Sequence, residues 1–174
     1  MKFFNFLPIF FLSAYTYSCS DLLDTEIRVL DSIETVNLCE YTNHVVLVVN
    51  VASRCGYTYQ YSSLQKLYES YKENDFVVLG VPSRDFMQEY SDEGDVAEFC
   101  STEYGVDFPM FATSKVRGQK ASPLYKKLIA KSGVSPKWNF NKYLISREGE
   151  VVSTYGSSVK PDSIELISKI EELL

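Results

Sequence analysis

The sequence is short of the residues that several common catalytic and binding sites require. Its 174 residues include one histidine, His44, and no two cysteines spaced as C-x-x-C. A zinc site with His and Cys ligands is therefore poorly supported, and so is a Cys–His pair for nucleophilic catalysis. A single histidine among apolar neighbours is more typical of a loop or strand edge than of a catalytic site.

Clustered positive charge is also missing. The chain has 17 Lys and Arg against 23 Asp and Glu, which gives a net charge of -6, and its basic residues are scattered. This balance argues against nucleic acid or an anionic membrane as the main partner, because a phosphate-binding surface needs clustered Lys and Arg. With 45% hydrophobic and 23% charged residues, the composition is that of one ordinary globular domain.

The only long apolar stretch lies at the start of the chain. Lys2 precedes a mostly apolar segment, residues 3–14, and small residues at 16 and 18 lead up to Cys19. We expect residues 1–18 to be a cleaved secretory signal and the protein to be exported, periplasmic or secreted. The segment is too short to span a bilayer comfortably, since a spanning helix needs about 20 apolar residues. The alternatives are a retained anchor or a lipidated Cys19, although Thr16 stands where a lipoprotein signal usually has Leu.

Four cysteines remain to be placed: Cys19, Cys39, Cys55 and Cys100. In an oxidising compartment they allow three complete pairings, and the sequence alone does not choose among them.

The hydrophobic pattern predicts an α/β domain over residues 25–174. Continuous β-branched runs predict buried strands, amphipathic or capped segments predict helices, and Arg147-Glu148-Gly149 predicts the turn of a hairpin. The strands are expected at 45–51, 76–81, 143–145 and 151–155, and the helices from Ser62 or Ser63 to Tyr71 and at 95–104, 123–130 and 162–174. This order is that of a thioredoxin-like fold, a central mixed sheet flanked by helices.

Cys55 is the candidate nucleophile. It comes shortly after the first strand and precedes a helix, which is the usual place for chemistry in an open α/β sheet. A helix N-terminus and the neighbouring Arg54 would favour the thiolate, the form in which a cysteine attacks. The alternative is a small buried core residue. Thr58 occupies the position of a second cysteine in C-x-x-C, so a single attacking thiol fits better than dithiol exchange.

Five ordered motifs resemble the glutathione peroxidase family in its cysteine-containing, non-selenium form. They are N-V-A-S-R-C-G-Y-T at 50–58, V-P-S-R-D-F at 81–86, F-C-S-T-E-Y-G-V-D-F-P-M-F at 99–111, P-L-Y at 123–125 and K-W-N-F at 137–140. The resemblance covers nearly all of residues 25–174. It implies a thiol-dependent peroxidase that reduces hydrogen peroxide or organic and lipid hydroperoxides in oxidative stress defence. The short segment before Trp138 resembles that of monomeric members.

The resemblance also implies roles for individual residues. Cys55 attacks the peroxide and becomes a sulfenic acid, while Trp138 and Asn139 lie beside it as hydrogen-bond donors. The alternative for Trp138, the only Trp of the chain, is packing in the core. A thiol such as glutathione or a thioredoxin-like protein then reduces the sulfenic acid, and no cofactor is implied. The alternative from another class is a non-catalytic thioredoxin-like binding module.

Three positions depart from the family pattern. Asp85 stands where the family usually has Gln; an ionised Asp cannot donate to the sulfur, so either Asp85 is turned away or protonated, or Gln88 is the donor instead. The resolving cysteine of thioredoxin-using members aligns with Ser101, and Cys100 precedes it by one position, about 100° around a helix. Cys100 is therefore either a resolving cysteine that acts after the helix unwinds, or a buried helix residue. Ser83 replaces the cysteine of the family's F-P-C.

Overall fold

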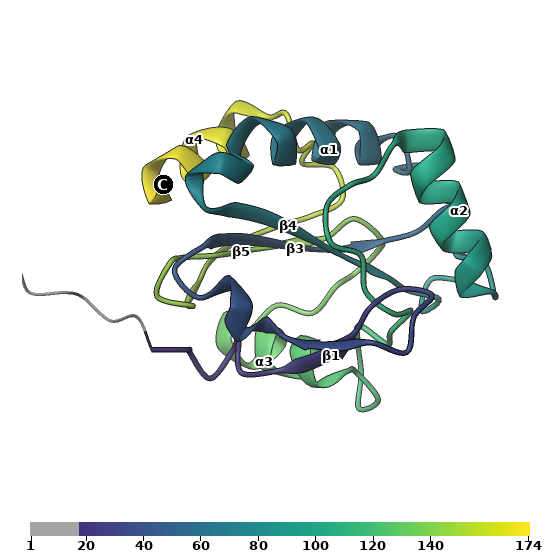
Figure 1. Cartoon of the computed structure of the whole chain (residues 1–174), viewed down its shortest axis with the longest axis horizontal. Coiled ribbons are helices and arrows are strands. Elements are labelled where there is room, and N and C mark those ends of the chain that lie inside the picture. Colours follow the sequence, from purple (N-terminus) through teal and green to yellow (C-terminus); the bar gives the residue numbers. More distant parts are fainter. Residues whose placement is uncertain (1–17) are drawn as a thin grey trace, which may run out of the picture.

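The computed structural model describes residues 18–174, whose main sheet has four strands and is flanked by helices (Figure 1). The sheet has the strand order β4-β3-β5-β6. Its strands are β3 (Val45–Val51), β4 (Phe76–Pro82), β5 (Lys142–Ile145) and β6 (Val151–Tyr155). β3 and β4 are parallel, whereas β5 is antiparallel to both β3 and β6. The predicted mixed sheet and the hairpin around Arg147-Glu148-Gly149 are confirmed. The expected signal at residues 1–18 lies outside the described residues except for Ser18.

Four helices cover the sheet. They are α1 (Gln60–Tyr71), α2 (Glu93–Tyr104), α3 (Pro123–Ser132) and α4 (Ile164–Leu173). In Figure 1, α1 and α4 lie on one side of the sheet and α3 on the other. Neighbouring residues of β3 accordingly belong to two different core clusters: Val49 to the one that contains Leu64 and Ile170, and Val48 to the one that contains Leu124. Burial on both faces explains why β3 is apolar at every position except Asn50.

The start of α1 differs from the prediction. The helix begins at Gln60 rather than after Ser62 or Ser63, and Tyr59 at its N-cap makes no side-chain cap. The reason is that the preceding turn winds directly into the helix, since the Thr58 N–H donates to the Cys55 carbonyl at 3.0 Å and the Gln60 N–H to the Tyr57 carbonyl at 2.9 Å. This continuity ties the position of Cys55 to that of α1.

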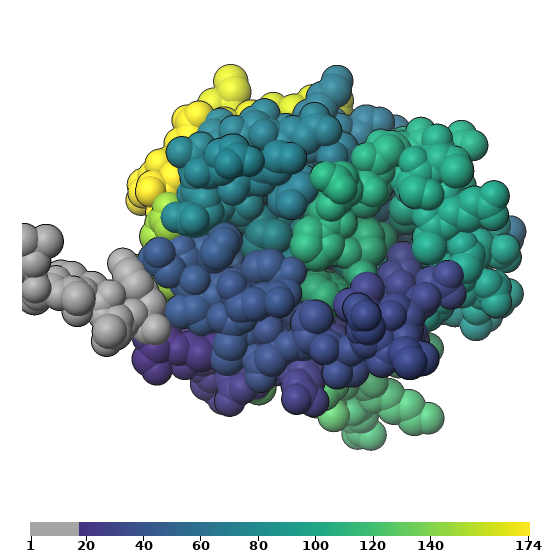
Figure 2. Space-filling view, in the orientation of Figure 1, coloured from purple at the N-terminus to yellow at the C-terminus, as the bar shows by residue number. Residues whose placement is uncertain are grey.

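A short hairpin precedes the sheet and was not predicted. β1 (Glu26–Arg28) pairs antiparallel with β2 (Thr35–Asn37), and a 3-10 helix, η1 (Leu38–Tyr41), follows. Strands of three residues are too short to show an alternating pattern. A second 3-10 turn, η2 (Lys72–Asn74), follows α1. The hairpin residues, purple and dark blue, cover the lower part of the face shown in Figure 2.

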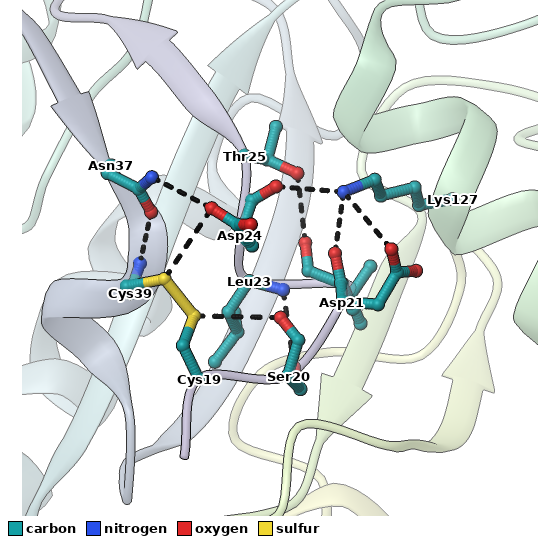
Figure 3. Close-up of a disulfide and its surroundings, with 10 residues drawn as sticks. Cys19, Ser20, Asp21, Leu23, Asp24, Thr25, Asn37, Cys39 and Lys127 are labelled. Carbon is teal, nitrogen blue, oxygen red and sulfur yellow. Dashed lines mark hydrogen bonds and ion pairs between the residues drawn. A yellow bond between two sulfur atoms is a disulfide. The ribbon is translucent and has the colours of Figure 1, made fainter.

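A disulfide joins Cys19 to Cys39, so that the start of the described chain is fastened to η1 (Figure 3). The same region is held by Asn37, whose amide donates to the Asp24 carboxylate at 3.0 Å, and by Lys127 of α3, whose amine donates to the Asp24 carbonyl at 2.8 Å. The structure thus contains one of the possible cysteine pairs and leaves the other two cysteines as free thiols.

Within residues 18–174, no helix is long and apolar enough to cross a membrane. The same part of the chain holds no cluster of three or more His, Cys, Asp and Glu side chains that could bind a metal ion.

Candidate active site

Cys55 lies in a tight turn after β3. Its own N–H donates to the Thr58 hydroxyl at 2.9 Å, and that hydroxyl donates to the Ala52 carbonyl at 2.8 Å. The Tyr57 N–H points at the Cys55 sulfur, 3.4 Å away. Thr58 therefore shapes the turn from the position at which a dithiol enzyme would carry its second cysteine. Because an N–H donor stabilises sulfur in its anionic form, the turn is suited to a reactive thiolate.

The segment after β4 lies against this turn. The Arg54 N–H donates to the Gln88 carbonyl at 2.9 Å, and the Ser53 N–H donates to the Glu89 carboxylate at 3.1 Å. The Arg54 guanidinium lies over the ring of Tyr90, 4.0 Å from its centroid. The charge next to Cys55 is thus engaged by an aromatic face. The Gln88 carbonyl and the Glu89 carboxylate hold this segment beside the candidate nucleophile.

Gln88 meets Asn139 across the site. The Asn139 amide donates to the Gln88 side-chain oxygen at 3.0 Å, and Asn139 is fully buried. Met87 turns the chain just before Gln88 with a left-handed φ of 58°, and its own side chain is 93% exposed. With its oxygen occupied by Asn139, Gln88 keeps its own amide protons for another acceptor.

Asp85 does not belong to this group of side chains. One carboxylate oxygen pairs with the Lys115 amine at 2.9 Å, and the other accepts from the Val116 N–H at 2.7 Å. Burial acts to raise the pKa of Asp85, but the hydrogen bonds and the charge of Lys115 outweigh it and hold the pKa below its usual value. Asp85 is therefore an ionised, engaged side chain. Asp85 is thus turned away from the Cys55 turn, which is one of the possibilities that the sequence left open, and this corrects its expected place among the catalytic residues.

Trp138 is held by its backbone and has a half-exposed ring. Its carbonyl accepts from the amides of Asn50 and Asn141, each at 2.9 Å. Trp138 is 41% exposed, and its indole packs against Phe86 with 5.4 Å between ring centroids. The alternative for this residue, packing in the hydrophobic core, is therefore wrong.

Comparison with known proteins shows which family the chain belongs to. Residues 22–129 match the glutathione peroxidase family model. The chain belongs to the glutathione peroxidase family. A glutathione peroxidase homolog, BsaA, of Halalkalibacterium halodurans is 48% identical over 142 residues, which cover 79% of this chain and 89% of that protein. A hydroperoxy fatty acid reductase of Synechocystis is 43% identical over 150 residues, covering 80% of this chain and 88% of the relative.

Solved structures extend the likeness to the fold. The crystal structure of T. cruzi GPX1 superposes with a TM-score of 0.67 at 33% identity, covering 88% of this peroxidase and 96% of that chain. The predicted thioredoxin-like fold is confirmed. The predicted activity, that of a thiol-dependent peroxidase, is confirmed at the level of the family.

Cys100 is the other free thiol of the peroxidase. It is 2% exposed near the C-terminal end of α2, and burial raises its pKa to about 11. At neutral pH such a thiol stays protonated and is a weak nucleophile. Ser83, which replaces the cysteine of F-P-C, is fully buried, and its hydroxyl accepts from the Asp85 N–H at 3.2 Å. In this conformation Cys55 therefore has no second reactive thiol from either Cys100 or position 83.

The different contacts of Asp85 and Gln88 lead to opposite expectations for their variants. Asp85→Asn should leave the rate of Cys55 oxidation within about twofold and lower the free energy of unfolding by on the order of 1 kcal/mol, because it removes an ion pair with an exposed lysine. Gln88→Leu should slow the oxidation, because it removes a donor. Stopped-flow oxidation and thermal unfolding measure both effects. A large acceleration by Asp85→Asn would instead place its charge at the sulfur.

Proposed function

We propose that Cys55 carries out the peroxidase reaction with Gln88, Asn139 and Trp138 as its hydrogen-bond donors. The observation that supports this assignment most is the hydrogen bond between the Asn139 and Gln88 side chains. Gln88 is in turn bonded to the Cys55 turn, because its carbonyl accepts from the Arg54 N–H. Three separate parts of the chain are thereby brought to one end of the sheet. Asp85 stabilises the conformation of the loop that leads to Gln88 through its bonds to Lys115 and Val116.

The reaction consists of the oxidation of Cys55, the condensation of its sulfenic acid with a thiol, and one thiol–disulfide exchange. The Cys55 thiolate attacks the terminal peroxide oxygen; an S–O bond forms, the O–O bond breaks, and the departing oxygen leaves as an alcohol or water after taking up a proton. Cys55 becomes a sulfenic acid. A first reductant thiol condenses with it to a mixed disulfide and releases water, and a second thiol frees Cys55 and leaves as the oxidised disulfide.

The donors act where negative charge moves during the first step. Charge passes from the sulfur to the departing oxygen, so preorganised N–H groups lower the barrier by stabilising that oxygen. The buried Asn139 amide and the Trp138 indole offer such N–H groups, and Gln88 offers a further amide. Half-exposed Trp138 and exposed Met87 also offer apolar contacts to an organic peroxide. Lipid hydroperoxides are therefore included with hydrogen peroxide as proposed substrates, in line with the name of the Synechocystis relative.

The proposed reductant is a small thiol such as glutathione, with a thioredoxin-like protein as the alternative. Burial of Cys100 supports this order, because a thioredoxin-like reductant acts most readily on an intramolecular disulfide. A monomer without a bound cofactor is part of the same proposal, supported by the short link between α3 and Trp138.

A peroxide-consumption assay on the purified protein tests the proposed function. Hydrogen peroxide and a fatty acid hydroperoxide are each supplied with glutathione or with a thioredoxin system. We expect turnover with at least one reductant and a rate of Cys55 oxidation far above that of free cysteine. Binding without any peroxide consumption would favour the alternative, a non-catalytic thioredoxin-like module.

The same proposal places the mature protein outside the cytoplasm. The Cys19–Cys39 disulfide supports it, because structural disulfides persist in oxidising compartments. A Cys19 sulfur that is bonded to Cys39 cannot also carry a lipid. Intact-mass measurement of the protein isolated from its own cells should show cleavage near residue 18 and no acyl chain. A lipidated Cys19 or a retained segment 1–18 would contradict this placement.

A further inference from the structure

Lys142 carries a buried amine that the proposed reaction does not use. It is fully buried in β5, although a charged amine is costly to bury. Its amine donates to the Gln60 side-chain oxygen at 2.9 Å and to the Phe140 carbonyl at 2.8 Å. None of the ion pairs found within residues 18–174 includes it. Burial lowers the pKa of Lys142 to about 7. A side chain kept in so unfavourable a place calls for an explanation beyond packing.

One partner of Lys142 belongs to the Cys55 side of the site. Gln60 is the first residue of α1, which continues from the Cys55 turn. Its N–H donates to the Tyr57 carbonyl at 2.9 Å, and the Tyr57 N–H points at the Cys55 sulfur. The Gln60 amide also donates to the Ser157 carbonyl at 2.7 Å, so its oxygen is left facing the Lys142 amine.

The other partner of Lys142 is Phe140, which directly follows the proposed donors Trp138 and Asn139. Phe140 has a left-handed φ of 61°, a conformation that a bulky residue adopts only when its surroundings hold it. The carbonyls of the three W-N-F residues are each bonded by a side chain. Asn50 and Asn141 bond that of Trp138, Ser157 bonds that of Asn139, and Lys142 bonds that of Phe140.

We propose that Lys142 is a positioning residue that fixes the W-N-F donors relative to the Cys55 turn, by bonding Phe140 on one side and Gln60 on the other. The inference rests on the proposed roles of Cys55, Trp138 and Asn139. Peroxide cleavage needs the sulfur and the donors in one arrangement, whereas alkylation of the thiolate needs the sulfur alone. Loss of the bridge should therefore slow the first reaction selectively.

Lys142→Met tests this proposal, because it keeps the length and apolar volume of the stem and removes the amine. Lys66→Met, at an exposed position on α1, is the matched control. Two second-order rates are measured for the folded proteins at one pH: oxidation of Cys55 by hydrogen peroxide and its alkylation by iodoacetamide. We expect Lys142→Met to lower the peroxide rate at least about tenfold and the alkylation rate less than about twofold. The control should change neither rate.

Other outcomes would overturn the proposal. Unchanged rates in Lys142→Met would give Lys142 a purely structural role, and an equal loss in both rates would mean that it acts on the thiolate through its charge. If Lys142→Met does not fold, Gln60→Leu breaks the same bridge from the other side and must reproduce the selective loss. Failure of the proposed function is recognised separately, because the unmodified protein would then react with peroxide no faster than free cysteine.

Discussion

Cys55→Ser is expected to abolish peroxide reduction and to leave the fold intact. The hydroxyl of serine is too weakly acidic to supply the nucleophile, and it cannot form a sulfenic acid. The substitution is nearly isosteric, and the Tyr57 N–H can donate to the new hydroxyl as it does to the sulfur. Peroxide consumption should fall to the background rate, while the thermal unfolding midpoint shifts by no more than a few degrees, as about 1 kcal/mol would produce.

Cys100→Ser is the control for this variant, since it removes the other free thiol. The oxidation of Cys55 by the first peroxide molecule should proceed at the unmodified rate, because the buried Cys100 thiol is not the attacking group. Retained peroxide reduction in Cys55→Ser, combined with its loss in Cys100→Ser, would transfer the peroxidase role to Cys100.

Trp138→Phe is expected to slow the oxidation of Cys55 by ~10²–10³, the typical cost of losing one preorganised donor. The phenyl ring keeps the contact with Phe86 but has no N–H. Because the indole is half-exposed, the free energy of unfolding should change little. Competition for peroxide against a reference peroxidase gives the rate without relying on Trp fluorescence, which this variant lacks.

Tyr59→Phe serves as the control for Trp138→Phe, because it removes a polar group from another exposed aromatic residue outside the W-N-F segment. Its oxidation rate should remain within about twofold of the unmodified rate, as is usual for a surface change. An unchanged rate in Trp138→Phe would remove the indole from the reaction and leave Asn139 and Gln88 as its donors.

The regular elements of the fold could be predicted because their patterns are local. β3 and β4 are almost entirely apolar, and Gly105 ends α2 with a left-handed φ of 59°. The beginning of α1 could not be predicted from its caps, because the Cys55 turn rather than a capping side chain starts the helix. The β1–β2 hairpin has strands too short for any periodic signal.

The site was predictable only in part, because its geometry depends on contacts between distant segments. The motifs pointed to Cys55, Trp138 and Asn139, but the choice between Asp85 and Gln88 depends on contacts with residues 115, 116 and 139, which are far away in sequence. One feature of the sequence could have indicated Lys142. It is a lysine at the start of a buried strand, K-Y-L-I. Such a lysine is unexpected in a buried strand unless it has partners.

The fate of oxidised Cys55 separates the two roles left open for Cys100. With Cys100 buried within a complete α2, we expect the sulfenic acid to persist until an external thiol arrives. A disulfide between Cys55 and Cys100 after peroxide treatment would show that α2 unwinds, and it would make a thioredoxin-like protein the preferred reductant.

Peptide mapping by mass spectrometry after one equivalent of hydrogen peroxide, with dimedone present to trap sulfenic acid, tests directly whether Cys55 is the residue that attacks the peroxide. We expect a dimedone adduct on the Cys55 peptide, an unmodified Cys100 thiol and an intact Cys19–Cys39 disulfide. Consumption of the peroxide with Cys55 still a free thiol would contradict this expectation.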